Sequence, residues 1–468
     1  MIINMKTLNN IKAGKGFSAS LWVGLLLMLH LFSCKGFLDV KPSKALLVPT
    51  TLSDFDALLD NTNIFNTGPE LNEIASDDLY TTDDGWVSLS SPEEQPVYIF
   101  ADAPFQGIGY IGDWDTPFQQ VFYTNVVLDG LQALNPAVDG SDYNRVKGSA
   151  LFQRAFAFYN AVRLFSKPYN AQTAATDLGI PLRLNSQVNI KSVRATVKAT
   201  YDQVLNDLKV ASALLPLTPK FKTRPCKPAA LGLLARIYLS MGDYTDAGKY
   251  ADSCLQLYNK LYDYNTLDST SSSPLPQVIP DNGDEVIFYA GLTSYDYDFS
   301  SLTFVDSVLY RSYQNNDLRR VMFFMNNGSG LYNYKGTYTG NEVFFGGLAT
   351  DEIYFIRAEC FVRAGNLTAG LADLNTVLST RWKAGTFVSF SAADADGALQ
   401  LILRERRKEL VARGLRWDDL RRLNTDPRFQ TTVSHPINGQ QHLLVPGDKH
   451  YVFPIPDYEI KLSGIQQN

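Results

Sequence analysis

Apolar side chains recur every three or four residues along several long segments of the chain. One such segment runs from Val197 to Leu215 and stops at Pro216. Because an α-helix has 3.6 residues per turn, this spacing places the apolar side chains on one helix face. The same pattern predicts helices at 151–165, 117–134 and 351–364, so helix is the predicted main element.

Part of this pattern occurs twice. Residues 234–244 can be laid over residues 357–367, with Ala235 and Ala358 three positions before an aromatic residue. Gly242 and Gly365 then follow that aromatic residue by four positions. Small residues allow two helices to approach closely, and glycine permits the turn between them, as in tetratricopeptide-like helical hairpins. The sequence therefore predicts such hairpins within 116–262 and 351–425.

Two long stretches lack this periodicity. Residues 66–115 are rich in Asp, Gly, Pro and aromatic residues, and residues 263–345 contain a Ser-rich run and several Tyr. Loops of this length within a compact fold are usually functional or mobile. We expect them to carry the ligand-binding face, with short strands such as Glu285–Tyr289 inside them.

The N-terminus has the pattern of an export signal. Lys6, Lys12 and Lys15 precede an apolar run, Leu21–Phe32, that is too short to span a bilayer permanently. Cys34 follows directly after a small residue, which is the arrangement that bacterial lipoprotein processing requires. We therefore predict that residues 1–33 are removed and that Cys34 carries the lipid anchor.

The net charge and the cysteines of the chain indicate which kinds of function are not expected. The net charge of −6 becomes about −9 once the three lysines of residues 1–33 are removed, so a uniformly basic nucleic-acid surface is not expected. Three cysteines remain besides Cys34. We interpret Cys226, Cys254 and Cys360 as small buried apolar residues, with one disulfide as the alternative.

Four segments, in order along the chain, resemble the SusD/RagB family of nutrient-binding outer-membrane lipoproteins. They begin with Cys34-Lys35-Gly36-Phe37-Leu38-Asp39, followed by 154–216 and 227–247. The fourth segment is the most specific and contains three motifs in order: Glu405-Arg406-Arg407-Lys408-Glu409-Leu410, then Gly414-Leu415-Arg416-Trp417-Asp418-Asp419-Leu420, then Tyr451-Val452-Phe453-Pro454. Ser149 and Ser166 depart from the family pattern.

The resemblance implies a mainly α fold, in which residues 34–468 form one SusD-like domain with a scaffold of helical hairpins, long inserted loops and a few short strands. It also implies a lipoprotein exposed at the cell surface on the outer membrane. Its partners would be a SusC-like TonB-dependent transporter and a nutrient, most simply an oligosaccharide or polysaccharide. No cofactor, metal or nucleic acid is implied.

Aromatic side chains are the best candidates for contacting a sugar, because a flat ring suits the apolar face of a pyranose and nearby polar groups suit its hydroxyls. In each case a core role is an alternative. Trp382 and Trp417 lie in helical or motif contexts and are expected to pack in the core. The predicted ligand-binding residues are Trp86, Tyr110, Trp114, Tyr295 and Tyr297, with Asp78, Asp113 and Asp296 as polar partners.

The charged block at 404–422 mixes both signs. We interpret it as a structural ion-pair network, with Glu409–Arg413 and Asp418–Arg422 as helical pairs four residues apart, and an anionic-ligand site is the alternative.

Catalysis has little support in the sequence. Only three histidines, His435, His442 and His450, remain beyond the export signal, and they lack metal-ligand spacing. The adjacent acids Asp77-Asp78 and Asp83-Asp84 do not by themselves define a glycosidase pair. We expect no catalytic residues. The alternatives left open are peptide or another nutrient as cargo, a surface glycoside hydrolase, and a cytoplasmic helical-repeat adaptor.

Overall fold

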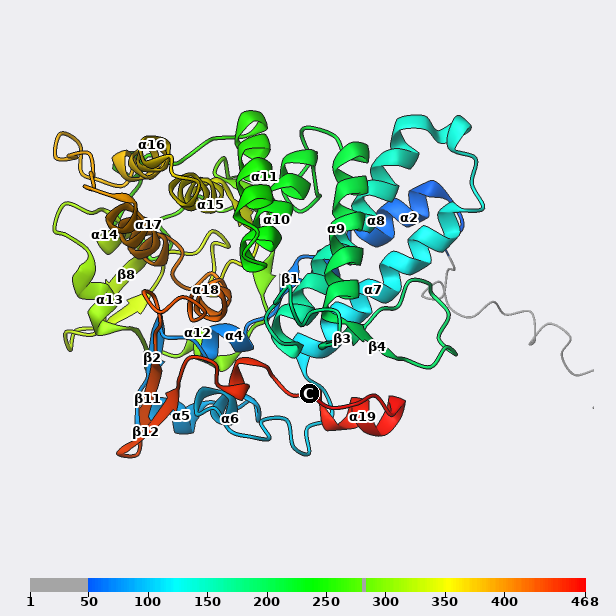
Figure 1. The fold of residues 1–468 in the computed structure, drawn as a ribbon, viewed down its shortest axis with the longest axis horizontal. Helices are drawn as coiled ribbons and strands as arrows, with labels where there is room; N and C mark the ends of the chain where they lie inside the picture. Colours follow the sequence, from blue (N-terminus) through cyan, green and yellow to red (C-terminus); the bar gives the residue numbers. More distant parts are fainter. Residues whose placement is uncertain (1–48, 280–282) are drawn as a thin grey trace, which may run out of the picture. The chain divides into compact units, whose positions relative to one another are not determined.

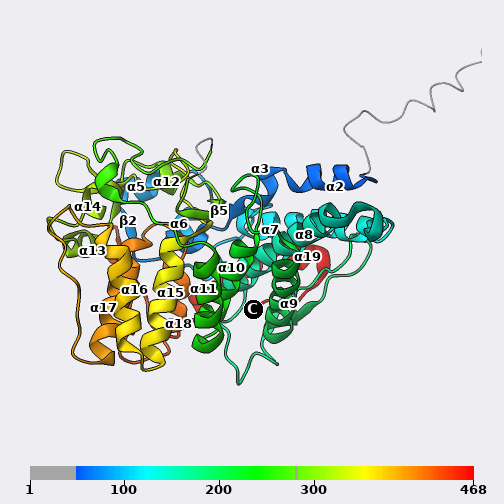
Figure 2. The same ribbon diagram turned by 90° about the horizontal axis from the view of Figure 1, so that it is seen from above.

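Helices that pack side by side form most of the structure between residues 112 and 424 (Figures 1 and 2). The computed structural model describes residues 49–279 and 283–468, so the predicted export signal and Cys34 lie outside the described residues. Two helical hairpins lie at the centre of this array, and short helices and strands cover one end of it. The mainly helical architecture predicted from the periodicity is confirmed.

The helices and strands have the following bounds. The α-helices are α2 (Leu52–Leu59), α3 (Thr62–Phe65), α4 (Leu71–Ile74), α5 (Asp83–Ser88), α6 (Glu94–Tyr98), α7 (Gly112–Leu131), α8 (Pro136–Phe165), α9 (Val197–Leu214), α10 (Lys227–Ser240), α11 (Tyr244–Leu257), α12 (Asp296–Phe299), α13 (Ser307–Ser312), α14 (Arg319–Phe323), α15 (Thr350–Arg363), α16 (Leu367–Ser379), α17 (Ala395–Glu409), α18 (Arg416–Leu423) and α19 (Asp457–Ser463), with 3₁₀ turns η3 (Tyr264–Thr266) and η4 (Lys449–Tyr451). The strands are β1 (Thr67–Gly68), β2 (Leu79–Thr81), β3 (Leu178–Pro181), β4 (Arg194–Thr196), β5 (Val286–Phe288), β6 (Gly291–Leu292), β7 (Thr303–Val305), β8 (Phe324–Asn326), β9 (Tyr332–Tyr334), β10 (Leu348–Ala349), β11 (Val433–Ile437) and β12 (Gln440–Leu444).

The repeat seen in the sequence corresponds to two hairpins of the same construction. Helices α10 and α11 form the first, and α15 and α16 form the second. Gly242 and Gly365 adopt positive φ angles of 75° and 83° at the two turns, a backbone conformation that glycine adopts without steric cost. Asp243 and Asn366 then cap the second helix of each hairpin through their side chains.

Local signals also explain the ends of the flanking helices. Thr196 caps α9 by accepting a hydrogen bond from the Ala199 backbone, and α9 ends at Leu214, just before Pro216. Helix α7 begins at Gly112, five residues before the predicted start at Pro117. Helix α8 changes direction at Gly140, whose φ of 50° and ψ of −120° are not helical. Figure 2 shows the row of helices from α9 through α10, α11, α15 and α16 to α17.

The helical array encloses the main apolar core. Cys226, Cys254 and Cys360 are buried free thiols within it, as predicted, and Cys254 Sγ lies 3.2 Å from the Pro228 carbonyl oxygen. Trp417 is fully buried and stacks on Phe453 with ring centroids 5.4 Å apart. Trp382 is also buried, so the packing roles expected for both tryptophans are confirmed.

The two aperiodic stretches pack against each other. Strand β1 pairs in parallel with β6, and β2 pairs antiparallel with β7, so residues 67–81 join residues 291–305. The predicted strand near 285–289 is present as β5, which pairs with β10. These pairings bring elements from both predicted ligand-face segments together, β1 near the middle of the helical array and β2 on the side that carries α13 and β8 (Figure 1).

Candidate ligand-binding site

Partly exposed aromatic rings gather where the two aperiodic stretches meet. The register of β2 and β7 places Tyr80 opposite Phe304, with ring centroids 5.8 Å apart. Strand β9 lies beside β7, because the Asn333 side-chain amide donates to the Thr303 carbonyl oxygen over 2.7 Å. Three short strands from both stretches therefore support a single surface.

A stacked tyrosine pair lies beside these strands. Tyr310 and Tyr332 stack with ring centroids 3.7 Å apart and planes inclined by 18°. Arg320 Nε donates to the Tyr310 hydroxyl over 3.0 Å, and the guanidinium also lies over the Tyr310 ring. The pair thus offers a partly exposed aromatic surface next to a positively charged hydrogen-bond donor.

Trp86 lies in helix α5, which follows β2 in the chain and approaches the start of β7. Its indole Nε1 donates to the Gln95 carbonyl oxygen over 3.1 Å, which fixes the ring while leaving part of it exposed. Gly85 allows α5 to approach closely, since a Cβ there would lie 2.8 Å from the Leu302 Cβ. We call the partly exposed rings of Tyr80, Trp86, Tyr310 and Tyr332 the aromatic face.

Several of the predicted ligand-binding residues are not exposed, so the expectation that they present ring or carboxylate to a ligand is wrong. Trp114 is 2 % exposed and packs edge-on against Phe165. Tyr295 is buried and donates through its hydroxyl to Asp113 Oδ2 over 2.9 Å, and Tyr297 is completely buried. Aromatic residues in aperiodic segments fill the core beneath short elements as readily as they line a surface.

The predicted carboxylates have structural partners as well. Asp113 Oδ1 accepts hydrogen bonds from the Glu70 and Leu71 backbone amides, and Asp78 Oδ1 accepts from Arg407 Nε over 2.9 Å. Asp113 and Asp78 are both buried. Asp296 is half-buried and accepts from the Ser90 backbone amide over 2.8 Å, which joins the two aperiodic stretches.

Tyr110 is 62 % exposed but does not belong to the aromatic face. The neighbouring Ile111 amide donates to the hydroxyl of Tyr458 in α19, an element well separated from α5 in both ribbon views (Figures 1 and 2). Of the predicted rings, only Trp86 lies on the face. Tyr80, Tyr310 and Tyr332 were missed, although Tyr332-Asn333-Tyr334 between two glycines has the alternation of a short strand.

Acids with buried carboxylate oxygens lie in helices α6 and α12 and just before α4. Burial raises the pKa of Asp298 to about 8 and that of Glu94 to about 7, and Glu94 accepts a hydrogen bond from the Tyr297 backbone amide. Glu70, which lies within hydrogen-bonding reach of Asp298, has its pKa raised by burial and then by the Asp298 charge. These acids therefore tend to retain protons near neutral pH.

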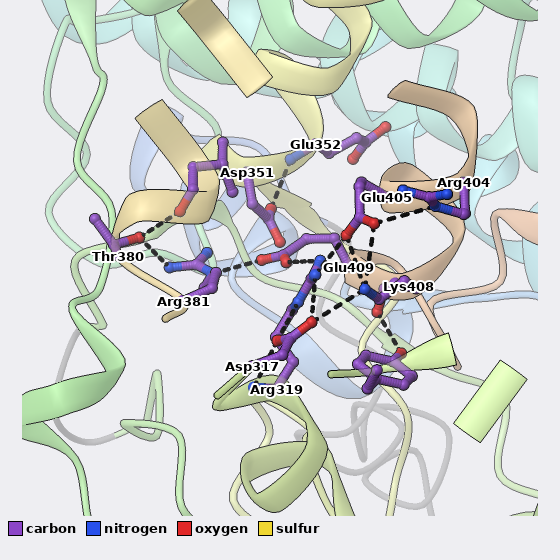
Figure 3. A network of polar contacts seen from close by, with 12 residues as sticks. Asp317, Arg319, Asp351, Glu352, Thr380, Arg381, Arg404, Glu405, Lys408 and Glu409 are labelled. Atoms are coloured by element: carbon purple, nitrogen blue, oxygen red, sulfur yellow. Dashed lines mark hydrogen bonds and ion pairs between the residues drawn. The ribbon is translucent and has the colours of Figure 1, made fainter. Parts of the chain in front are cut away.

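The charged block at 404–422 forms a buried ion-pair network, as interpreted from the sequence, but with different partners. Arg319 contacts Asp317, Glu405 and Glu409, and Arg381 contacts Glu409 (Figure 3). Arg381 also pairs with Glu285. The two predicted helical pairs are wrong: Arg413 contacts Asp351, Asp418 contacts Arg163, and Arg422 contacts Glu359 and Asp419. Helix α17 ends at Glu409, so Arg413 does not lie on the same helix.

The same network contains the carboxylates most closely grouped among the described residues. Ligand atoms of Glu285, Asp351 and Glu409 lie within 4.8 Å of one another. Arg381 contacts Glu285 over 2.5 Å and Glu409 over 2.7 Å, and Arg413 Nη1 lies 3.2 Å from Asp351. Guanidinium groups therefore supply positive charge to this cluster.

The residues considered for catalysis are held in structural contacts. Asp77 pairs with Arg416 over 2.6 Å while Asp78 pairs with Arg407, so neither carboxylate is free. Burial opposes ionisation of Asp77, but Arg416 and Arg407 outweigh it and lower its pKa. His435 is buried with Nδ1 2.6 Å from the Tyr98 carbonyl oxygen and Nε2 2.8 Å from that of Ser76. Both of its ring nitrogens are thereby occupied.

The chain matches known protein families over two long segments. A family described as "Starch-binding associating with outer membrane" matches residues 36–239, and the SusD family matches residues 350–468. The chain belongs to the SusD/RagB family. The two matched segments include both helical hairpins in whole or in part, together with the charged block.

Solved structures of SusD superfamily proteins share the fold. One from Bacteroides vulgatus is 22 % identical, covers 90 % of this chain and 99 % of its own, and gives a TM-score of 0.72. Another, from Bacteroides thetaiotaomicron, is 21 % identical over 89 % of this chain and 99 % of its own, with a TM-score of 0.71. A SusD-like carbohydrate binding protein from Bacteroides vulgatus gives a TM-score of 0.67 at 19 % identity, covering 89 % of this chain and 97 % of its own.

A curated relative matches a shorter stretch. SusD-like protein P2 of Formosa agariphila is 28 % identical over 140 residues, which are 30 % of this chain and 25 % of the relative. The matched stretch thus spans about a quarter of that relative's length. Among the described residues of the SusD/RagB chain, no helix combines the length and apolar character needed to cross a membrane.

Proposed function

We propose that this SusD/RagB protein is a cell-surface lipoprotein that binds an oligosaccharide or polysaccharide and delivers it, uncleaved, to a SusC-like TonB-dependent outer-membrane transporter. The observation that carries the proposal is the aromatic face. Its rings are partly exposed, carried by strands β2 and β9 and by helices α5 and α13, and accompanied by Arg320. Flat rings beside hydrogen-bond donors suit the apolar face and the hydroxyls of a sugar.

The comparisons support the same class of ligand. The family that matches residues 36–239 is described as starch-binding and outer-membrane-associated, and one protein of similar fold is described as carbohydrate binding. These descriptions belong to the relatives, and they favour carbohydrate over peptide as the first cargo to test. The predicted lipid on Cys34 would hold the protein at the membrane.

Binding is tested with a glycan array that also displays peptides, followed by calorimetry on the strongest ligand. We expect Trp86→Ala and Tyr332→Ala each to weaken glycan binding by about tenfold, since each removes a ring that stacks on the sugar. Tyr110→Ala is the matched control, because it removes an exposed ring outside the aromatic face. Unchanged affinity in both face variants would remove the site, and peptide binding alone would change the cargo.

Two further measurements test delivery without cleavage. The purified protein is incubated with the bound glycan, and the appearance of new reducing ends would contradict a pure binding role. Isolation of the protein from outer membranes of its own cells should co-purify a TonB-dependent barrel identified by mass spectrometry. Absence of any such barrel under mild detergent would contradict the proposed partnership.

A further inference from the structure

A large cavity among the described residues lies away from the aromatic face. It has a volume of about 910 Å³ and is bordered by the end of α18, by the segment 167–178 and by the C-terminal segment 447–468. This volume lies in the range of sites that bind small molecules. Its lining includes Lys167, Asp177, Arg421, Asp102, Asp448, Lys449 and His450.

The acidic groups of the cavity all have basic partners. Asp177 pairs with Lys167 over 2.8 Å. Asp102 pairs with Lys449 and also lies 3.0 Å from His450 Nε2, while Asp448 lies 2.6 Å from His450 Nδ1. Each of these acids is therefore already neutralised or hydrogen-bonded by a neighbour at the cavity.

Arg421 differs from the other charged groups of the cavity. It is 7 % exposed, and its Nη2 donates to the Ser166 carbonyl oxygen. Its Nε is buried without a hydrogen-bond partner, and Nη1 makes no hydrogen bond to any described residue. A buried guanidinium with unused donors is energetically costly unless an acceptor reaches it.

Among the described residues, no acid forms an ion pair with Arg421. The charge of Asp418 acts on Arg421, but its Oδ2 is paired with Arg163 Nη1 over 2.9 Å. Burial accordingly lowers the pKa of Arg421, and Asp418 only partly opposes this effect. The interior side of the cavity therefore carries a guanidinium that no ion pair with a described residue neutralises.

We propose that this cavity is a second binding site, which takes a small ligand bearing an oxyanion, a carboxylate or a sulfate, held by Arg421. The site is independent of the aromatic face. A planar guanidinium recognises oxyanions through paired, charge-assisted hydrogen bonds, and Nη1 is available for this role. The charged block at 404–422 is interpreted from its sequence as an ion-pair network, with an anionic-ligand site as the alternative. The neighbouring arginines form ion pairs, whereas Arg421 fits the alternative.

The test uses three sugars that differ in one group: glucuronate, glucose 6-sulfate and glucose. Binding to the purified protein is measured by calorimetry at low ionic strength. We expect at least one of the two anions to bind on the order of tenfold more tightly than glucose, and added salt to reduce this difference. The tighter of the two anions identifies the preferred oxyanion.

Variants locate the site. Arg421→Gln should abolish the preference for the anion, whereas Arg421→Lys should retain part of it. Lys383→Gln is the charge-matched control, because Lys383 is exposed, makes no ion pair with a described residue and does not line the cavity. Trp86→Ala should leave anion binding unchanged, which separates this site from the proposed glycan face.

Two results would overturn the proposal. The first is equal affinity of the unaltered protein for both anions and for glucose. This result needs no variant, so it remains decisive even if Arg421→Gln fails to fold. The proposal is also overturned if the Arg421→Gln protein, shown by circular dichroism to be folded, still prefers the anion. That result would mean that the anion binds elsewhere.

Discussion

Arg236 of α10 and Glu352 of α15 form a buried, two-pronged ion pair that joins the two helical hairpins. The Nε–Oε1 distance is 2.7 Å and the Nη2–Oε2 distance is 2.6 Å. Arg236 Nη2 also donates to the Gly347 carbonyl oxygen. The pair thus fixes the first helix of one hairpin against the first helix of the next.

Breaking this pair should destabilise the protein strongly. Glu352→Gln leaves the buried guanidinium without its counter-charge, and we expect the free energy of unfolding to fall by about 3 to 5 kcal/mol in urea denaturation. Lys249→Gln is the control, because Lys249 pairs with Asp246 at the surface and its loss should cost less than about 1 kcal/mol. Equal effects of the two substitutions would contradict a structural role for the buried pair.

The two hairpin turns should respond alike to the same substitution. A Cβ added at Gly242 or Gly365 meets no atom within 4 Å, so Gly242→Ala and Gly365→Ala change only backbone strain at a positive φ. We expect each to lower the free energy of unfolding by about 1 kcal/mol. Gly109→Ala, equally free of contacts but without a positive φ, should not destabilise; a similar loss there would argue against backbone strain as the cause.

Asp298 should make stability depend on pH. Its pKa is raised to about 8 in the folded protein by burial, against an ordinary value of 3.8. Between about pH 4 and 8 the folded chain therefore keeps a proton that the unfolded chain has released, so the free energy of unfolding falls as pH rises. Asp298→Asn removes this contribution, and the stability of the variant relative to the unaltered protein should rise between pH 5 and 8 by on the order of 3 kcal/mol.

The exposed Asp84 supplies the control for that experiment, because its side chain makes no hydrogen bond with a described residue. Asp84→Asn should shift stability equally at pH 5 and pH 8. A constant offset for Asp298→Asn across the same range would show that Asp298 is ionised in the folded state.

Cys34 should carry the membrane anchor. We expect cells grown with labelled palmitate to label the protein, and Cys34→Ala to abolish the label and release the protein from the membrane fraction. The control is Cys226→Ala, which removes a buried thiol that cannot serve as the processing site and should leave labelling intact. Labelling that persists in the Cys34→Ala variant would contradict the predicted lipid attachment.

The helical part of the fold was predictable because its determinants are local. Apolar spacing, Pro216 and the glycines at 242 and 365 act within a few residues, so helix positions and hairpin turns follow from the sequence. Hydrogen-bond partners of the charged block were not predictable in this way. Arg163 lies far from Asp418 in the sequence, and nothing in the spacing of either residue indicates that they meet.

The aromatic face shows the same limit. Tyr295 and Trp86 occur in similar aperiodic contexts, yet one is buried and the other partly exposed. Which ring faces solvent depends on the pairing of β2 with β7 and on the close approach that Gly85 allows. Those contacts depend on tertiary structure. The two aperiodic stretches that carry the aromatic face could therefore be predicted, but most of the rings that form it could not.

The pairing of the two aperiodic stretches has a consequence for how the protein forms. Thr293 Oγ1 donates to the Gly68 carbonyl oxygen at a sequence separation of 225 residues, while each helical hairpin closes within about 30 residues. The first hairpin, α10–α11, can therefore form while synthesis continues, but the neighbourhood of Tyr80 stays open until residue 305 is available. Chains interrupted before that point would contain helices α7 to α11 but lack the second hairpin, and they would present no finished surface to a nutrient.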